Sequence, residues 1–311
     1  AENYFDFLRL RTEPKGGELR PEGFESLELR GLRFAYPGGE ELLHGVDLSI
    51  EEGEFVALLG HNGSGKTTLT RLMMALDHPR SGQILVDGDD IAHYEPADLA
   101  DKIGYVFQNP DLQILADTVY EEVAYGPRVK KLPEANIRAN VDEALRVMGL
   151  TDLKDYYPRL LSFGQKRRLG VAAALALNPR TLILDEITNG QDAAEQGAMM
   201  EYLKALNEKK GTTILLITHD MDIVRRYAKR TLVLCDGRVV FTGTPAELFA
   251  TGEALKAWGL RRPVVSTLSL EFGLTGVTGC EAFCDALAGA LPDGAALDGT
   301  GFPASKGGAA Q

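Results

Sequence analysis

The sequence has few cysteines and no long apolar run, and each shortage excludes a class of protein. Three cysteines in 311 residues, Cys235, Cys280 and Cys284, provide no disulfide framework and suit a reducing compartment. Cys280 and Cys284 could share a helix face, but no further Cys or His nearby would complete a metal site there. No apolar stretch approaches the ~20 residues that span a bilayer, and residues 1–15 lack the apolar core of a signal peptide. We therefore expect a soluble or peripheral protein.

The sequence also has fewer basic residues than acidic ones. The chain carries 33 Lys and Arg against 45 Asp and Glu, which gives a net charge of −12. Such a chain is a poor default binder of nucleic acid, although a local basic patch can exist within an acidic total. A hydrophobic content of 44% is ample for a packed core, in one large domain or in one domain plus an appendage.

One glycine-rich run follows the phosphate-binding pattern G-x-x-x-x-G-K-[ST]. It comprises Gly60, His61, Asn62, Gly63, Ser64, Gly65, Lys66, Thr67 and Thr68. The apolar residues 55–59 before it predict a buried strand, and residues 68–76 after it predict a helix. A strand that turns tightly into a helix directs backbone N–H groups and the positive end of the helix dipole at one spot, which binds polyphosphate. A chance Gly-rich turn with this pattern has a frequency on the order of one in a hundred chains of this length.

Alternating buried strands and helices indicate an α/β fold with a parallel sheet covered on both faces. We expect antiparallel strands within residues 27–55. Further strands are predicted near 83–86, 104–107, 182–184 and 213–217, with a hairpin at 232–234 and 239–242 and helices at 165–177 and 191–209. Residues 112–160 have a helical pattern, with breaks expected at Pro127 and Pro133.

Composition also suggests domain boundaries. Residues 1–26 carry mixed charges, Pro and Gly, and are interpreted as a mobile extension. Residues 27–250 form the nucleotide-binding domain, with a helical subdomain at about 110–165. Residues 251–291 are expected to form a small helical domain, with a helix from about 281 to 291, and residues 292–311 a flexible tail. No internal repeat is visible, so we expect one nucleotide-binding module.

A second chemical signal is the apolar run 181–184 followed by Asp185 and Glu186. A buried strand would deliver both carboxylates to the edge of the sheet beside the phosphate loop. Asp185 would then hold a Mg²⁺ shell, and Glu186 would orient and deprotonate an attacking water. Solvated acids at an exposed strand end are the alternative interpretation.

The third signal is Leu161-Ser162-Phe163-Gly164-Gln165. With the loop and the two carboxylates, it makes residues 27–245 resemble the ABC ATPase family, whose signature is LSGGQ. Four smaller matches have the family's order and spacing: an adenine-stacking aromatic, the Q-loop glutamine, the D-loop aspartate and the switch histidine, at Tyr36, Gln108, Asp192 and His219. Individually, Tyr36 could be a core aromatic, Gln108 a surface amide and His219 a capping or core histidine, but their shared order with the three stronger motifs favours the family.

The resemblance implies a P-loop NTPase (RecA-like) core with an antiparallel β subdomain, a helical subdomain and a small C-terminal helical extension. It implies ATP and Mg²⁺ as ligands. Catalysis would rest on Lys66, Gln108, Glu186 and His219, with Thr67, Gln108 and Asp185 around the metal. Two subunits would face each other head to tail. Each would close its partner's ATP with Ser162, Gly164 and Gln165.

Three positions depart from the family pattern. Phe163 replaces the first signature Gly, Ile187 stands where Pro is usual, and Gln191 where Leu is usual. If position 163 required a positive φ, Phe there would incur strain of about 1–3 kcal/mol. These departures affect the site that this chain completes in its partner, and they motivate the hypothesis of a heterodimer with unequal sites.

Two stretches resemble the energy-coupling-factor branch of the family: the Q-loop at 107–113 and residues 243–249. Residues 255–291 resemble that branch's C-terminal domain more loosely. The branch implies a peripheral subunit on the cytoplasmic face of the membrane, working with a second ATPase, a transmembrane coupling protein and a membrane substrate-binding protein. The cargo would be a vitamin or a transition-metal ion. The alternatives are a soluble ABC ATPase acting on DNA or ribosomes, an ATP-binding regulatory subunit with weak hydrolysis, and a small P-loop kinase.

Overall fold

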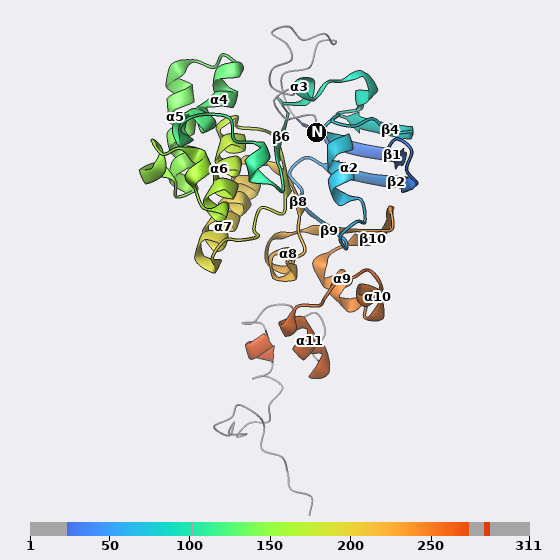
Figure 1. Cartoon of the computed structure of the whole chain (residues 1–311). Helices are drawn as coiled ribbons and strands as arrows, with labels where there is room; N and C mark the ends of the chain where they lie inside the picture. The colour runs from blue at the N-terminus through green and yellow to red at the C-terminus, as the bar shows by residue number, and fades with distance from the viewer. Residues whose placement is uncertain (1–23, 101, 274–282, 287–311) are drawn as a thin grey trace, which may run out of the picture. The chain divides into compact units, whose positions relative to one another are not determined.

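The computed structural model describes residues 24–100, 102–273 and 283–286 (Figure 1). The chain divides into two compact units between Leu260 and Arg261. Residues 1–23 of the extension predicted at 1–26, and the tail predicted at 292–311, lie outside the described residues.

The first unit is built on a six-stranded sheet with the order β10-β9-β3-β8-β7-β6. Its strands are β3 (Phe55–Leu59), β6 (Ile103–Val106), β7 (Thr181–Asp185), β8 (Thr213–Ile217), β9 (Arg230–Cys235) and β10 (Arg238–Gly243). All neighbours are parallel except β9 and β10, which form the predicted hairpin. Every residue of β3, β7 and β8 is buried, as expected for apolar strands covered on both faces.

A second, antiparallel sheet has the order β2-β1-β4-β5. It contains β1 (Ser26–Ala35), β2 (Glu41–Glu51), β4 (Ser81–Val86) and β5 (Asp89–Asp90). The prediction of antiparallel strands here is confirmed. The ordered part begins slightly earlier than expected, because Phe24 is already fully buried in the core below this sheet.

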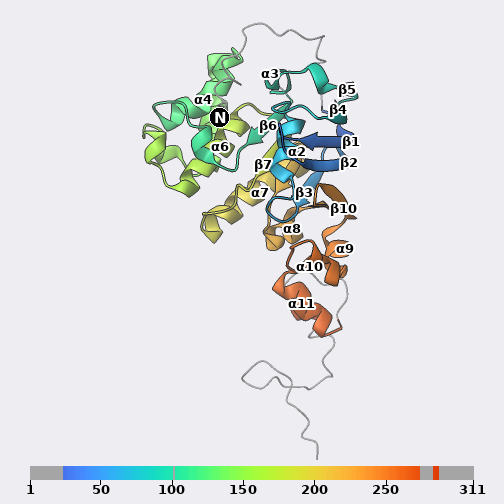
Figure 2. The ribbon, with the colours of Figure 1, turned by 45° about the vertical axis from the view of Figure 1, so that its right-hand side comes forward.

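Neighbouring residues of the central strands face two different cores. Ile183 packs with the antiparallel sheet and with helix α2 (Lys66–Met73), whereas Leu182 and Leu184 pack with the helices of the other face. Those helices are α4 (Val119–Val129), α5 (Glu134–Val147), α6 (Phe163–Ala176) and α7 (Ala193–Lys210). Figures 1 and 2 show α4 and α6 on the side of the sheet away from β1 and β2.

Short elements connect these layers. They are the helices α3 (Pro96–Leu99), α8 (Met221–Tyr227), α9 (Pro245–Ala250) and α10 (Glu253–Ala257), and the 3-10 turns η1 (Ile91–His93), η2 (Pro110–Leu112), η3 (Thr151–Leu153) and η4 (Pro158–Leu160). None of the helices in the described part of the chain has both the length and the apolar composition that crossing a bilayer requires.

The two prolines of the helical subdomain behave differently. Pro133 lies at the N-cap of α5, so the predicted break there is confirmed. Pro127 does not break the chain, which corrects the expectation: it is buried inside α4, and the helix ends two residues later. A proline so near a helix end removes only one backbone hydrogen bond, and burial of its ring favours keeping the helix intact.

The nucleotide-binding unit extends past residue 250. Leu248, Leu255 and Leu260 pack against Leu59 and Val233 of the central sheet, so α9 and α10 belong to the first unit. The second unit contains α11 (Val264–Glu271) and a helical turn at 283–286, where the rings of Phe272 and Phe283 lie 5.9 Å apart. Of the helix expected at 281–291, only residues 283–286 are described.

Candidate nucleotide-binding site

The phosphate loop turns the chain from β3 directly into α2. Gly60 and Gly65 have φ values of 150° and 103°, which other residues rarely adopt. A Cβ atom on Gly60 would lie 2.1 Å from the backbone oxygen of Leu234. No side chain caps the N-terminus of α2, so its first N–H groups are left for an anion. Within the loop Asn62 and Gly63 are exposed.

Lys66 is held by the loop itself. Its Nζ donates hydrogen bonds to the carbonyl oxygens of Gly60, at 2.7 Å, and of His61, at 2.9 Å. Burial lowers the pKa of Lys66, while the charges of Glu186 and Asp185 act in the opposite direction. The ammonium therefore lies at the loop, where a bound polyphosphate would replace the lost solvation.

Asp185 ends β7 beside the start of α2. The Thr67 hydroxyl donates to its Oδ2 at 3.2 Å, and the carboxyl is 2% exposed. Burial, and next the charge of Glu186, raise the pKa of Asp185 to about 6. A buried carboxylate beside a hydroxyl and a second carboxylate is a donor set that suits Mg²⁺.

Glu186 follows Asp185 with a φ of 50°, an uncommon value for a residue other than glycine. Its carboxylate lies among three polar side chains. Gln108 Nε2 donates to Oε2 at 2.7 Å, Asn189 Nδ2 donates to the same oxygen at 3.1 Å, and His219 Nδ1 lies 3.7 Å from Oε1. The ends of three parallel strands, β6, β7 and β8, thus converge on one carboxylate.

Arg167 joins the signature helix to this cluster, and sequence reasoning missed its role. Its guanidinium donates to the backbone oxygens of Glu186 and of Gln108. Burial lowers the pKa of Arg167, against the charges of Glu186 and Asp185. The sequence showed a basic run after the signature but gave no sign of which member turns inward. Asn189 was also missed, because a lone amide in a loop has no local signal.

The signature residues begin α6. Ser162 is the N-cap: its hydroxyl accepts from Gln165 N at 3.3 Å, and its own N–H donates to Gln165 Oε1 at 2.9 Å. A Cβ atom on Gly164 would lie 2.8 Å from the backbone oxygen of Gly190, so no larger residue fits there.

Phe163 occupies the first turn of α6 and is absent from the residues with positive φ, so the strain considered for this position does not arise. Its side chain is 48% exposed, and the Arg167 guanidinium lies 4.6 Å from the ring centroid. Phe163 therefore changes the exposed surface of the signature without distorting its backbone.

The remaining predicted residues lie in two places. Tyr36 is 46% exposed, and its hydroxyl lies 3.0 Å from Thr68 Oγ1, which places an open aromatic face at the phosphate loop. Asp192 accepts hydrogen bonds from Ala194 N and Glu195 N, so it caps α7. The structure thus gathers the loop, the carboxylates, Gln108, His219 and Tyr36, whereas Ser162, Gln165 and Asp192 contact their own helices.

Comparison with known proteins agrees with this geometry. The family model described as ABC transporter matches residues 43–189. The energy-coupling factor transporter ATP-binding protein EcfA1 of Symbiobacterium thermophilum is 44% identical over 245 residues, which cover 75% of this chain and 84% of the relative. Other curated relatives are much longer: the chain spans 42%, 47% and 40% of three of them.

Two solved structures have the same fold at substantial identity. One is cbiO1 from Clostridium perfringens, described as part of the ABC transporter complex cbiONQ; it is 39% identical with a TM-score of 0.66, over 78% of this chain and 97% of that one. The other is a dimeric ATP-binding cassette in a post-hydrolysis state bound to ADP and Pi. It is 32% identical with a TM-score of 0.66, over 70% of this chain and 98% of that one. The phosphate loop, the carboxylate strand and these matches together show that the chain belongs to the family of ABC transporter ATP-binding proteins.

Proposed function

We propose that this chain hydrolyses ATP as a peripheral, energy-supplying subunit of an energy-coupling-factor type membrane transporter. The observation that carries this proposal is the setting of Glu186. Its carboxylate lies at the end of β7, next to buried Asp185 and to the phosphate loop, and is oriented by Gln108 and Asn189. A carboxylate fixed in this way can orient a water molecule and accept its proton.

Different groups of the site have different roles in the proposed reaction. The free N–H groups of the loop and Lys66 bind the phosphates, and Tyr36 offers a stacking surface for the base. Glu186 positions the attacking water, and His219, on the other side of the carboxylate, contacts the γ-phosphate or that water. Because these donors are fixed before the reaction, they stabilise developing charge with little reorganisation.

Thr67 and Asp185 fit a magnesium ion, with Gln108 as a further oxygen donor at the edge of the site. Their side chains already touch, and the Asp185 carboxyl is buried next to a second carboxylate, an environment that a divalent cation would stabilise. An ion held there would neutralise charge on the phosphate oxygens.

Docking to a membrane partner is supported by the surface of the helical subdomain. Leu112, Tyr156, Tyr157 and Leu160 are large apolar side chains with 52%, 57%, 43% and 80% of their surface exposed. Leu112 lies four residues after Gln108, so one of these exposed side chains follows closely on the loop that contacts Glu186. Relatives named as energy-coupling factor transporter ATP-binding proteins, and a solved relative described as part of an ABC transporter complex, support the same arrangement. The cargo that we propose, a vitamin or a transition-metal ion, rests on the resemblance of the sequence to this branch.

We further propose that two nucleotide-binding subunits face each other, each completing its partner's site with the N-terminus of α6. The capped, solvent-exposed Ser162 at that N-terminus is suited to a second anion contact. Phe163 beside it would crowd both sites in a pair of two copies of this chain, but only one site in a pair whose second subunit has glycine there, which favours a heterodimer.

Two substitutions test hydrolysis directly. Lys66→Ala should abolish both ATP binding and phosphate release, and Glu186→Gln should abolish phosphate release with ATP binding retained, measured by calorimetry and a phosphate assay. Glu208→Gln on the exposed end of α7 is the matched control and should behave as wild type. Undiminished phosphate release by Glu186→Gln would overturn the proposal.

The transporter assignment needs a separate experiment. Purification of the chain from detergent-solubilised membranes should recover a multi-span protein and a second ATPase. Recovery of ribosomes or DNA ends instead would contradict it. Replacing Leu160 by Glu should release the membrane partner without changing ATP binding.

A further inference from the structure

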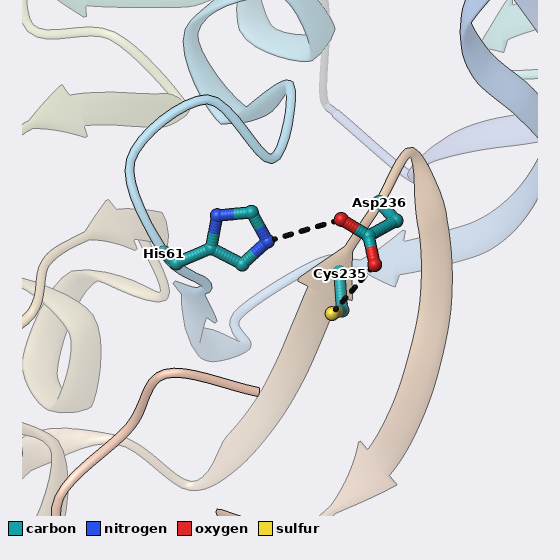
Figure 3. Close-up of side chains that lie close together, drawn as sticks. All are labelled: His61, Cys235 and Asp236. Carbon is teal, nitrogen blue, oxygen red and sulfur yellow. Dashed lines mark hydrogen bonds and ion pairs between the residues drawn. The ribbon is translucent and has the colours of Figure 1, made fainter. Parts of the chain in front are cut away.

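Three potential metal ligands gather beside the phosphate loop, outside the residues used above for hydrolysis. His61 belongs to the loop, Cys235 ends β9, and Asp236 lies in the turn to β10 (Figure 3). One ligand atom from each lies within 4.8 Å of the others. His61 and Cys235 are partly buried, and Asp236 is exposed, so an ion could enter from solvent.

The hydrogen bond made by His61 fixes which of its nitrogens faces the cluster. Nδ1 lies 2.8 Å from the backbone oxygen of Asn62, which can only accept, so Nδ1 carries the proton. In the neutral ring, Nε2 then presents a lone pair to Asp236 Oδ1 at 3.3 Å. A lone pair and a carboxylate oxygen at this distance can both coordinate one metal ion. A backbone carbonyl on the opposite nitrogen is the usual support for a metal-bound histidine.

The separations also match those of a zinc-class ion. Bonds of about 2.0 Å to nitrogen and oxygen and about 2.3 Å to sulfur place neighbouring ligands of a tetrahedral ion roughly 3.3–3.6 Å apart. The two carboxylate oxygens of Asp236 reach one partner each: Oδ1 lies 3.3 Å from His61 Nε2, and Oδ2 lies 3.6 Å from Cys235 Sγ. The three ligand atoms lie within 4.8 Å of one another, so small side-chain rotations would bring them to one ion. Imidazole, thiolate and carboxylate together favour zinc over magnesium or calcium.

We propose that His61, Cys235 and Asp236 bind one divalent ion of the zinc class, and that this ion weakens ATP binding at the adjacent loop. Three protein ligands leave a fourth position for water. The coupling to ATP rests on the proposed nucleotide binding, whereas the metal site itself does not.

The contacts between the loop and the β9–β10 turn give the coupling a physical basis. Gly237 N donates to the Ser64 oxygen at 3.3 Å, and Gly60 lies directly against the backbone oxygen of Leu234. An ion on His61 would add a second, stronger tie between the loop and the turn. The ion would favour the loop arrangement in which the Lys66 ammonium donates to the carbonyl oxygens of Gly60 and His61. ATP binding requires this ammonium to move toward the phosphates. An ion that favours the first arrangement therefore weakens ATP binding.

Binding must also release a proton, because a thiol coordinates as thiolate. That proton leaves to solvent.

Cobalt(II) is the probe for the site. The full chain, stripped with a chelator and free of nucleotide, should bind one equivalent and show a thiolate-to-cobalt charge-transfer band. Cys235→Ser should remove the band, and Asp236→Asn should weaken binding at least about tenfold. Cys284→Ser, which removes an exposed cysteine outside the cluster, is the matched control and should keep the band. Absence of the band in wild type, or its loss in Cys284→Ser alone, would overturn the metal site.

The coupling is tested with a non-hydrolysable ATP analogue in the presence and absence of Zn²⁺. Zn²⁺ should weaken analogue binding several-fold in wild type and in Cys284→Ser, and leave Cys235→Ser unchanged; that variant also controls for chelation by the nucleotide. Equal affinities in zinc-loaded and zinc-free wild type would refute the coupling. Failure to bind the analogue in either condition would instead refute the proposed function, since the cobalt spectrum requires no nucleotide.

Discussion

The side-chain amide of Gln108 donates a 2.7 Å hydrogen bond to the carboxylate of Glu186, across 78 residues of sequence. The contact joins the loop after β6 to the end of β7. In the proposed function it connects the surface that docks the membrane partner with the group that orients water. A movement of the loop that contains Gln108 therefore acts directly on Glu186.

Gln108→Ala should lower ATP hydrolysis about tenfold with little change in ATP affinity. A hydrogen bond to a charged group contributes about 1.5–3 kcal/mol, and part of this is recovered because Asn189 still donates to the same oxygen. The rate constants of phosphate release and the dissociation constant for ATP measure the two effects. Gln83→Ala, which removes another glutamine amide bonded to a carboxylate, is the control on the antiparallel sheet. Equal losses in both variants would contradict a role for the Gln108 contact.

The sequence predicted the elements that depend on local pattern. Apolar runs located all five parallel strands, and the glycine-rich loop located the phosphate site, because its backbone conformation requires glycine at Gly60 and Gly65. Two carboxylates after a buried strand indicated the edge of the sheet at which the candidate site lies. These features follow from periodicity and steric rules that act over a few residues.

What the sequence did not reveal depends on contacts between distant segments. Arg167 and Asn189 reach Glu186 only after the strands have assembled. The zinc-class cluster joins residues 174 positions apart, from His61 to Cys235. The only cysteine-containing metal site that the sequence analysis considered was the Cys280 and Cys284 pair. The break at Pro127 was predicted from the low helix propensity of proline, and burial of the residue in α4 overrides that propensity.

The raised pKa of Asp185 makes stability depend on pH in protein free of magnesium and nucleotide. The folded pKa of about 6 lies above the ordinary value of 3.8, so the folded state holds the proton more tightly. Its contribution is therefore most favourable below pH 3.8 and is lost as pH rises through 6. Between pH 4.5 and 7 wild type should lose about 2 kcal/mol of unfolding free energy relative to Asp185→Asn. Urea unfolding of both proteins measures this, and a constant difference would contradict it.

Arg167→Lys should lower hydrolysis by at least tenfold and destabilise the fold by about 2 kcal/mol. Lysine keeps the charge but cannot reach the backbone oxygens of Glu186 and Gln108 together, so one buried carbonyl loses its donor. Arg168→Lys is the matched control, because Arg168 is equally buried on the same helix but pairs with Glu195. Thermal unfolding and phosphate release separate the two effects. If Arg168→Lys reduced hydrolysis as much as Arg167→Lys, the positioning role of Arg167 would be lost.

Phe163→Gly should raise the turnover of the assembled transporter while slightly destabilising the isolated chain. The ring lies exposed at the N-terminus of α6, where the partner's nucleotide is proposed to bind, and its removal opens that surface. The isolated chain loses the contact with Arg167, about 0.5–1 kcal/mol. Phe163→Ala removes the same ring without glycine's backbone freedom, so it distinguishes crowding from conformation. Because the backbone at Phe163 is unstrained, both variants should accelerate phosphate release equally. Acceleration by Phe163→Gly alone would mean that the partner-bound state needs a backbone conformation that Phe cannot adopt. An unchanged rate in both variants would remove the case for unequal sites.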